Sequence, residues 1–177
     1  MELMHTEPGK ETFVNLINEN KRIIYKICNA YCRRKDERDD LAQEIVYQLW
    51  KSYKSFNPGF KFTTWMYRIA LNVAISYYRK EKKSGSKIIY TENLLELEEN
   101  QDASLESEKE LNLLQQFISE LKEIDRSIMI LYLDDKSYKE IADIMGLTET
   151  NVATKISRIK ELLRHNFSNY KNQSTWN

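Results

Sequence analysis

The sequence predicts an all-α protein made of two small helical domains joined by an acidic linker, with a helix-turn-helix in the second domain. First, its 177 residues include only 4 Gly and 2 Pro, whereas 31% are charged and 41% hydrophobic. This composition favours amphipathic helices over turn-rich sheets. Second, apolar residues recur every three or four positions along most of the chain. Third, charge changes in blocks, and the length allows one or two compact units.

The zero net charge of the whole chain hides a strong partition. Residues 1–83 carry 16 basic and 10 acidic side chains, a net charge of +6. Residues 84–108 carry one basic and seven acidic side chains, a net charge of −6, and residues 109–177 carry ten of each. A polar acidic stretch with scattered Leu and Ile cannot bury a core. We therefore expect domains at 1–83 and 109–177, and an interdomain linker at 84–108.

Three helices are expected in the first block. Apolar residues at helical spacing from Phe13 to Tyr31 predict one helix, and the charged segment 33–40 ends its apolar stripe. The stripe resumes over residues 41–53, which predicts a second helix. Asn57-Pro58-Gly59 is a turn signal, because Pro fixes its own φ and Gly permits positive φ. A third helix is expected from Trp65 to about Lys80, since apolar residues recur there every four positions.

The last block ends in the most specific pattern of the chain. Residues 111–121 and 128–133 predict two helices, after which Ser137-Tyr138-Lys139-Glu140 fits a capping box. Ala142, Gly146 and Val152 then follow at the spacing of a helix-turn-helix, in which the small residue permits close packing and the glycine forms the turn. Thr148 can cap the second helix. The exposed positions of that helix present side chains suited to reading base edges, although an ordinary helical hairpin remains the alternative.

Aromatic and basic residues are interleaved ahead of the linker. Nine of the chain's twenty aromatic residues lie between Trp50 and Tyr78, and residues 57–83 hold six basic residues against one acid, Glu81. Single-stranded nucleic acids are bound by this combination. For Trp50, Trp65 and Tyr67 a purely structural role in the core is an equal alternative. Phe60 and Phe62 are expected on an exposed loop.

Other classes of protein are disfavoured. No apolar run reaches the roughly 20 residues of a membrane span, and residues 1–10 lack a secretory signal, so we expect no membrane insertion and a cytoplasmic location. Cys28 and Cys32 lack a second Cys or His pair at metal spacing, so we expect no metal and no cofactor. They are expected to be two small apolar residues on a helix face in a reducing compartment, with a redox role as the alternative. No Gly-rich phosphate loop or nucleophile with a nearby His is present, which disfavours an enzyme.

Together these motifs resemble the sigma factors of bacterial RNA polymerase, most closely the minimal two-domain extracytoplasmic-function (ECF) group. Residues 39–46 with Leu49-Trp50 are similar to the helix that this family docks on the polymerase clamp, although a solvated acidic helix start is an alternative. Residues 65–74 are similar to its promoter-melting segment, and residues 138–164 to its minus-thirty-five helix-turn-helix. The resemblance implies that residues 1–83 are sigma region 2 and residues 109–177 are sigma region 4.

The resemblance also assigns three sets of site residues. The polymerase-binding set is Asp40, Gln43, Glu44, Leu49 and Trp50. The minus-ten set, for DNA binding and melting, is Phe60, Lys61, Phe62, Thr63, Trp65, Arg68, Asn72, Arg79 and Lys80, with Phe60–Thr63 as the loop that captures a flipped base. The minus-thirty-five set is Thr148, Glu149, Thr150, Asn151, Thr154, Lys155 and Arg158. Lys155 stands where the family commonly has Arg, so a looser contact replaces a bidentate one.

The predicted function is that of a transcription initiation factor. It would bind core RNA polymerase, recognise both promoter elements and help to open the DNA, without catalysing a reaction itself. Its expected partners are core polymerase and promoter DNA, and the sequence leaves open whether an anti-sigma factor holds it inactive. The alternative is a stand-alone helix-turn-helix regulator, which would bind duplex DNA without polymerase.

Overall fold

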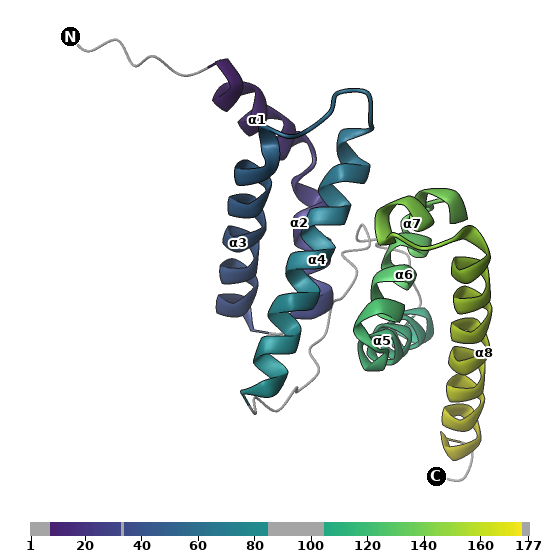
Figure 1. Ribbon diagram of the computed structural model, residues 1–177. Helices are drawn as coiled ribbons and strands as arrows, with labels where there is room; N and C mark the ends of the chain where they lie inside the picture. Colours follow the sequence, from purple (N-terminus) through teal and green to yellow (C-terminus); the bar gives the residue numbers. More distant parts are fainter. Residues whose placement is uncertain (1–7, 33, 85–104, 175–177) are drawn as a thin grey trace.

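The computed structural model describes residues 8–32, 34–84 and 105–174, which form eight α-helices and no strand (Figure 1). The N-terminal half, residues 8–84, contains α1 (Pro8–Glu19), α2 (Lys21–Tyr31), α3 (Lys35–Tyr53) and α4 (Phe62–Lys83). The C-terminal half, residues 105–174, contains α5 (Leu105–Glu120), α6 (Glu123–Leu133), α7 (Tyr138–Met145) and α8 (Glu149–Ser174). The all-α prediction is confirmed.

The single helix predicted over residues 13–31 is wrong, because Asn20 divides it into α1 and α2. The Asn20 side chain donates through Nδ2 to the Leu16 carbonyl at 2.8 Å, and the Asn20 backbone leaves the helical conformation at φ −112°, ψ 13°. A short amide side chain that bonds a nearby carbonyl competes with the helical ladder. The apolar stripe continues across the break, so spacing alone did not reveal it.

Helix α3 begins earlier than predicted, inside the charged segment 33–40. Asp36 and Glu37 lie in its first turn, where negative side chains interact favourably with the helix dipole. The Glu37 carboxylate also accepts a hydrogen bond from the Arg34 backbone N–H at 3.4 Å. The charged residues therefore start the second helix instead of forming a polar connection.

Helix α5 also begins earlier than expected, at Leu105, within the segment predicted as linker. No glycine or proline interrupts the sequence there. The acidic residues 92–102, on which the linker prediction depended, lie outside the described residues.

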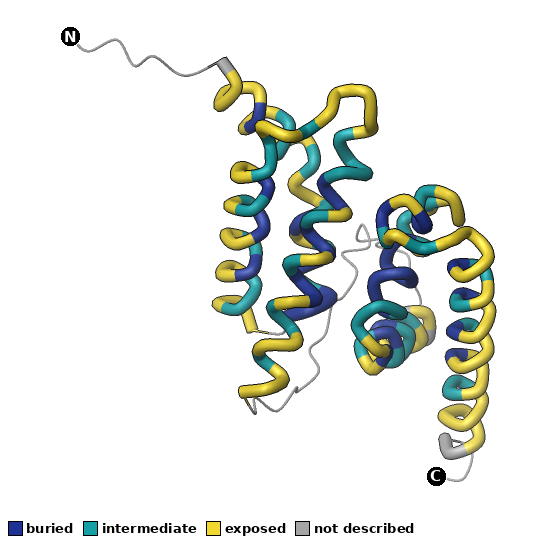
Figure 2. The backbone as a smooth tube through the Cα atoms, viewed as in Figure 1, coloured by how far each residue is buried: buried dark blue, intermediate teal, exposed yellow. Residues whose placement is uncertain are grey.

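Buried side chains form two hydrophobic clusters. The larger one begins between α2, α3 and α4 and continues through Ile128, Leu131 and Ile141 into the helix-turn-helix, so it belongs to both halves. The smaller one joins α5, α6 and α8. Figure 2 shows the buried positions along the inner faces of the helices of each half. None of the helices in the described ranges combines the length and hydropathy needed to cross a bilayer.

Candidate nucleic-acid interface

Helix α7 starts where the capping-box pattern places it. Ser137 is the N-cap, and its hydroxyl accepts a hydrogen bond from the Glu140 backbone N–H at 3.2 Å. In return the Glu140 carboxylate accepts from the Ser137 backbone N–H at 3.0 Å. These two bonds satisfy backbone donors that the first turn would otherwise leave unpaired. The predicted start of this helix is confirmed.

The turn between α7 and α8 has the predicted glycine geometry. Gly146 ends α7 in the left-handed conformation at φ 67°, ψ 37°, and the Leu147 N–H donates to the Ala142 carbonyl at 3.0 Å. The Thr148 hydroxyl then accepts from the Asn151 N–H at 3.2 Å, which caps α8. Val152 is fully buried between the two helices. The helix-turn-helix is therefore present, and Val152 fills the angle between its two helices as expected.

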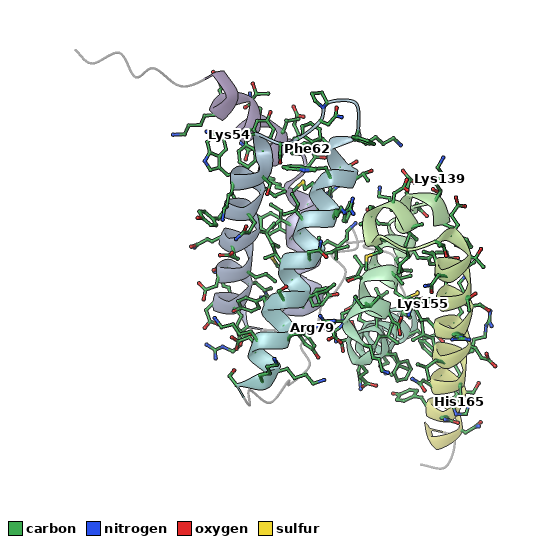
Figure 3. The ribbon with its side chains drawn as sticks, viewed as in Figure 1. Lys54, Phe62, Arg79, Lys139, Lys155 and His165 are labelled. Atoms are coloured by element: carbon green, nitrogen blue, oxygen red, sulfur yellow. The ribbon has the colours of Figure 1, made fainter. Side chains whose placement is uncertain are left out.

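Helix α8 presents a polar face to solvent. Most of the predicted minus-thirty-five set is exposed: Thr148, Glu149, Thr150, Asn151, Thr154 and Arg158. Lys155 differs, because it is half-buried and its Nζ lies 2.9 Å from Asp125 Oδ1 on α6 (Figure 3). Lys160 likewise turns inward, with Nζ 2.5 Å from the Tyr132 hydroxyl. The sequence did not reveal either partner, since both pairings join residues far apart in the chain.

The turn before α4 separates two kinds of aromatic residue. The Asn57 carboxamide accepts from the Gly59 N–H at 2.9 Å, and the Phe60 N–H donates to the Asn57 carbonyl at 3.1 Å. Phe60 projects from this turn with 69% of its surface exposed. Trp65, in contrast, is half-buried in a cluster of rings, with its centroid 5.1 Å from that of Phe56.

Phe62 and Thr63 do not lie on the expected loop. Phe62 is the first residue of α4, with Lys61 as its N-cap, and its ring centroid lies 5.3 Å from that of Trp65. The predicted exposure of Phe62 is therefore wrong. A helix that starts directly after Lys61 brings the Phe62 ring onto the aromatic cluster, and leaves Phe60 and Lys61 as the exposed members of the predicted loop.

The polar members of the minus-ten set lie along α4. Arg68, Asn72 and Lys80 are exposed. Two cations have partners in the C-terminal half: Arg79 Nε lies 2.8 Å from Glu123 Oε1, and Lys61 Nζ lies 3.3 Å from Glu140 Oε1. Figure 3 shows Arg79 reaching from α4 towards that half. The side-chain hydrogen bond from Arg79, the largest cause, holds the pKa of Glu123 below its ordinary value.

Helix α3 brings together most of the polymerase-binding set. Asp40, Gln43, Glu44 and Trp50 are exposed, whereas Leu49 is completely buried. The contact role predicted for Leu49 is therefore wrong in this structure, because Leu49 faces the core. Tyr47, which the sequence reasoning missed, lies on the exposed face with 56% of its surface accessible. Its spacing of seven residues from Asp40 could have indicated this position.

The comparisons with known proteins cover both halves. A family model described as sigma-70 region 2 matches residues 16–84, and one described as sigma-70, region 4 matches residues 111–163. The ECF RNA polymerase sigma factor SigW of Bacillus subtilis (strain 168) is 32% identical over 168 residues, with 88% of each chain covered. The chain belongs to the ECF sigma factors. The ECF sigma-E factor of Escherichia coli (strain K12) is 29% identical, covering 80% of this sigma factor and 81% of its own length.

Two solved structures share the fold of this sigma factor. RpoE of Bartonella quintana, in complex with the anti-sigma factor NepR, has a TM-score of 0.68 at 20% identity and covers 89% of this chain and 98% of its own. CnrH, in complex with the cytosolic domain of CnrY, has a TM-score of 0.65 at 18% identity and covers 90% and 89%.

Membership of this family establishes the function. The protein is a transcription initiation factor that binds core RNA polymerase and directs it to promoter DNA. The stand-alone regulator is the less favoured interpretation, because the relatives match both halves of the chain and not the helix-turn-helix alone.

Proposed function

We propose that this sigma factor divides polymerase binding and promoter recognition among three helices. Residues 1–83 act as region 2, in which α3 docks on core polymerase and α4 with its preceding turn binds and melts the minus-ten element. Residues 109–177 act as region 4, in which α8 reads the minus-thirty-five element, and residues 84–108 join the two. The observation that best supports this division is the solvent-exposed polar face of α8 behind a well-formed glycine turn.

Within α8, Asn151 and Arg158 are the best candidates for base contacts, because both are exposed and lie seven residues apart on one face. Lys155 lies between them and keeps one donor on Asp125. An ammonium has three donors, so Lys155 can hold Asp125 and still contact a phosphate or a base.

The chain would act without catalysing a reaction and in the cytoplasm, where core polymerase meets the chromosome. An anti-sigma factor is a further proposed partner, since one structural neighbour was solved with NepR bound.

Arg158→Ala tests the assignment of α8. A holoenzyme carrying it should discriminate poorly among promoters with varied minus-thirty-five elements, since one lost base contact costs about 1–3 kcal/mol, or about 5- to 150-fold. Run-off transcription from a library with this element randomised measures the loss. Lys122→Ala, which removes an exposed cation from the start of α6, is the matched control and should discriminate like wild type. Unchanged discrimination by Arg158→Ala would remove Arg158 from the reading face.

A further inference from the structure

Two lysines of α8 are held by side chains of α6. Lys155 Nζ lies 2.9 Å from Asp125 Oδ1, and Figure 3 shows Lys155 on the side of α8 that faces α6. Lys160 Nζ lies 2.5 Å from the Tyr132 hydroxyl and 4.2 Å from the centroid of the Tyr132 ring. Arg158, on the same helix, is exposed. Helix α6 therefore holds two cations of α8 and leaves Arg158 in solvent.

Of the two lysines, only Lys155 borders the proposed minus-thirty-five surface. An α-helix turns by about 100° per residue, so Lys155 lies about 40° around α8 from Asn151 and about 60° from Arg158. The next residue, Ile156, is buried. Lys160 lies about 160° around the helix from Arg158 and is therefore off this surface. Lys155 stands at the edge where the DNA-reading face of α8 meets the packed face.

Asp125 and Lys155 form a partly buried ion pair between two packed helices. Their side chains keep 26% and 32% of their surfaces exposed. Solvent screens such a pair less than it screens a fully exposed one, and a charge that has lost part of its water is costly to leave unpaired. Moving Lys155 away to a distant DNA phosphate would leave the Asp125 carboxylate without this partner.

Holding a lysine in place affects how well a protein distinguishes DNA sequences. Sequence-independent affinity comes from cations that meet phosphates, and a free lysine on its flexible four-carbon stem can follow phosphates in many positions. An ammonium held by Asp125 offers its two remaining donors at one place only. DNA gains from this cation only when an acceptor lies at that place, and restricting contacts with the wrong partner is one source of specificity.

We propose that Asp125 is a positioning residue that determines specificity for the minus-thirty-five element, because it keeps Lys155 on α6 and away from sequence-independent phosphate contacts. The inference rests on the role assigned to α8 under Proposed function. Asp125 acts through Lys155. It also lies in the first turn of α6, where an acid stabilises the helix dipole, so the test separates these two effects.

The test removes the carboxylate in a holoenzyme assembled with the full chain. Asp125→Ala releases Lys155, and Glu120→Ala, which removes one acid from an exposed position of the same half, is the matched control. Lys155→Ala and the double variant with Asp125→Ala complete a double-mutant cycle. Fluorescence anisotropy measures binding to two promoter duplexes at several salt concentrations. One duplex carries the minus-thirty-five element that wild type prefers in the randomised library, and the other carries a scrambled element.

Asp125→Ala should bind the scrambled duplex more tightly than wild type and should lose about fivefold in preference between the duplexes, the upper end for a partly exposed ion pair. One added phosphate contact should also steepen the slope of log K against log salt concentration by about 0.9 on the scrambled duplex. Both changes should disappear in the Lys155→Ala background, whereas a purely structural effect on α6 would persist there. Asp125→Asn keeps the size of the side chain and should change both quantities in the same direction if Asp125→Ala loses helical circular dichroism.

Three results would each overturn the role of Asp125: an unchanged preference between the duplexes, an equal change in Glu120→Ala, or the same loss in the Lys155→Ala background. The Arg158→Ala holoenzyme distinguishes this failure from failure of the proposed function. If Arg158→Ala lowers discrimination and Asp125→Ala does not, α8 reads the element and only the positioning role is wrong. If neither variant lowers discrimination, the assignment of α8 is wrong as well.

Discussion

At the scale of single residues, burial decides the chemistry of the two cysteines. Cys28 and Cys32 are free thiols in the core of the N-terminal half, and burial raises the pKa of each to about 12. Since only the thiolate reacts, we expect labelling of the native protein at pH 8 to be about a thousandfold slower than that of an ordinary exposed cysteine. Ellman's reagent measures this rate. The guanidinium-unfolded chain should react at once with both thiols, and equally fast labelling of the native protein would contradict the prediction.

Phe60 is exposed, unlike Phe56, which is close to it in sequence but half-buried. Phe60 projects into solvent, so Phe60→Ala should leave the melting temperature of the protein near wild type. Stacking of a base on an aromatic ring contributes about 1–3 kcal/mol, so the variant should reduce permanganate reactivity of promoter thymines in the holoenzyme. Tyr25→Ala, which removes an exposed ring from α2, is the control and should leave reactivity unchanged. A large drop in the Phe60→Ala melting temperature would instead assign Phe60 to the core.

Local rules predicted some residues well. Ser137, Glu140 and Gly146 behave as expected, because capping and a left-handed turn depend on neighbours within a few residues. Leu49 was assigned wrongly, since its exposure depends on helices that pack on it from elsewhere in the chain. Phe62 was assigned wrongly because α4 starts directly after Lys61, which brings the Phe62 ring onto Trp65. Lys155 was placed on the correct helix, yet its partner Asp125 lies 30 positions away and left no sequence signal.

At the scale of elements, the α7–α8 turn depends on the backbone of Gly146. A Cβ at this position would contact nothing within 4 Å, so any cost of a side chain comes from its positive φ alone. Gly146→Ala should therefore destabilise the protein by about 1–2 kcal/mol. Gly146→Asn, the matched variant, should cost less because asparagine tolerates this conformation. Urea unfolding measures both, and equal losses for the two variants would exclude backbone strain as the cause.

Helix boundaries were harder to predict than helices. Periodicity located the apolar faces of the N-terminal half, but it did not show that Asn20 interrupts one stripe or that the charged segment after Arg34 is already helical. Both errors have one origin, because polar residues can end a helix or begin one according to which backbone groups their side chains bond. The apolar pattern does not show which backbone groups these polar side chains bond, so it does not predict where such a helix begins or ends.

At the scale of the whole molecule, the larger hydrophobic cluster passes from α4 into α6 and the helix-turn-helix. Two halves that share one core should unfold together, so calorimetry of the free protein should give a single transition with equal calorimetric and van't Hoff enthalpies. Two resolved transitions would show that the halves are independently stable. Glu123→Lys with Asp134→Lys places cations opposite Arg79 and Lys26, so this variant should weaken the contact between the halves and broaden or split the transition.

The sequence pattern did not predict the contact between the two halves. Charge blocks suggested two separate domains, yet Arg126 and Asp134 were not singled out from the other charged residues of the last block. Their importance comes from partners about a hundred positions away, such as Tyr31 and Lys26. No short-range pattern marks such residues.

The shared core also affects how promoter specificity can be re-engineered. Exchanging the C-terminal half for that of a relative would supply a new reading helix, but it would also place a foreign α6 against Tyr31, Tyr67 and Tyr78. A chimera whose donor lacks counterparts of Asp134 and Arg126 would deprive the buried Tyr67 hydroxyl and the Ala30 carbonyl of these hydrogen-bond partners and leave an apolar face of α4 exposed, which favours aggregation. Transplanting only the exposed residues of α8 preserves the recipient's own interface and is the safer graft.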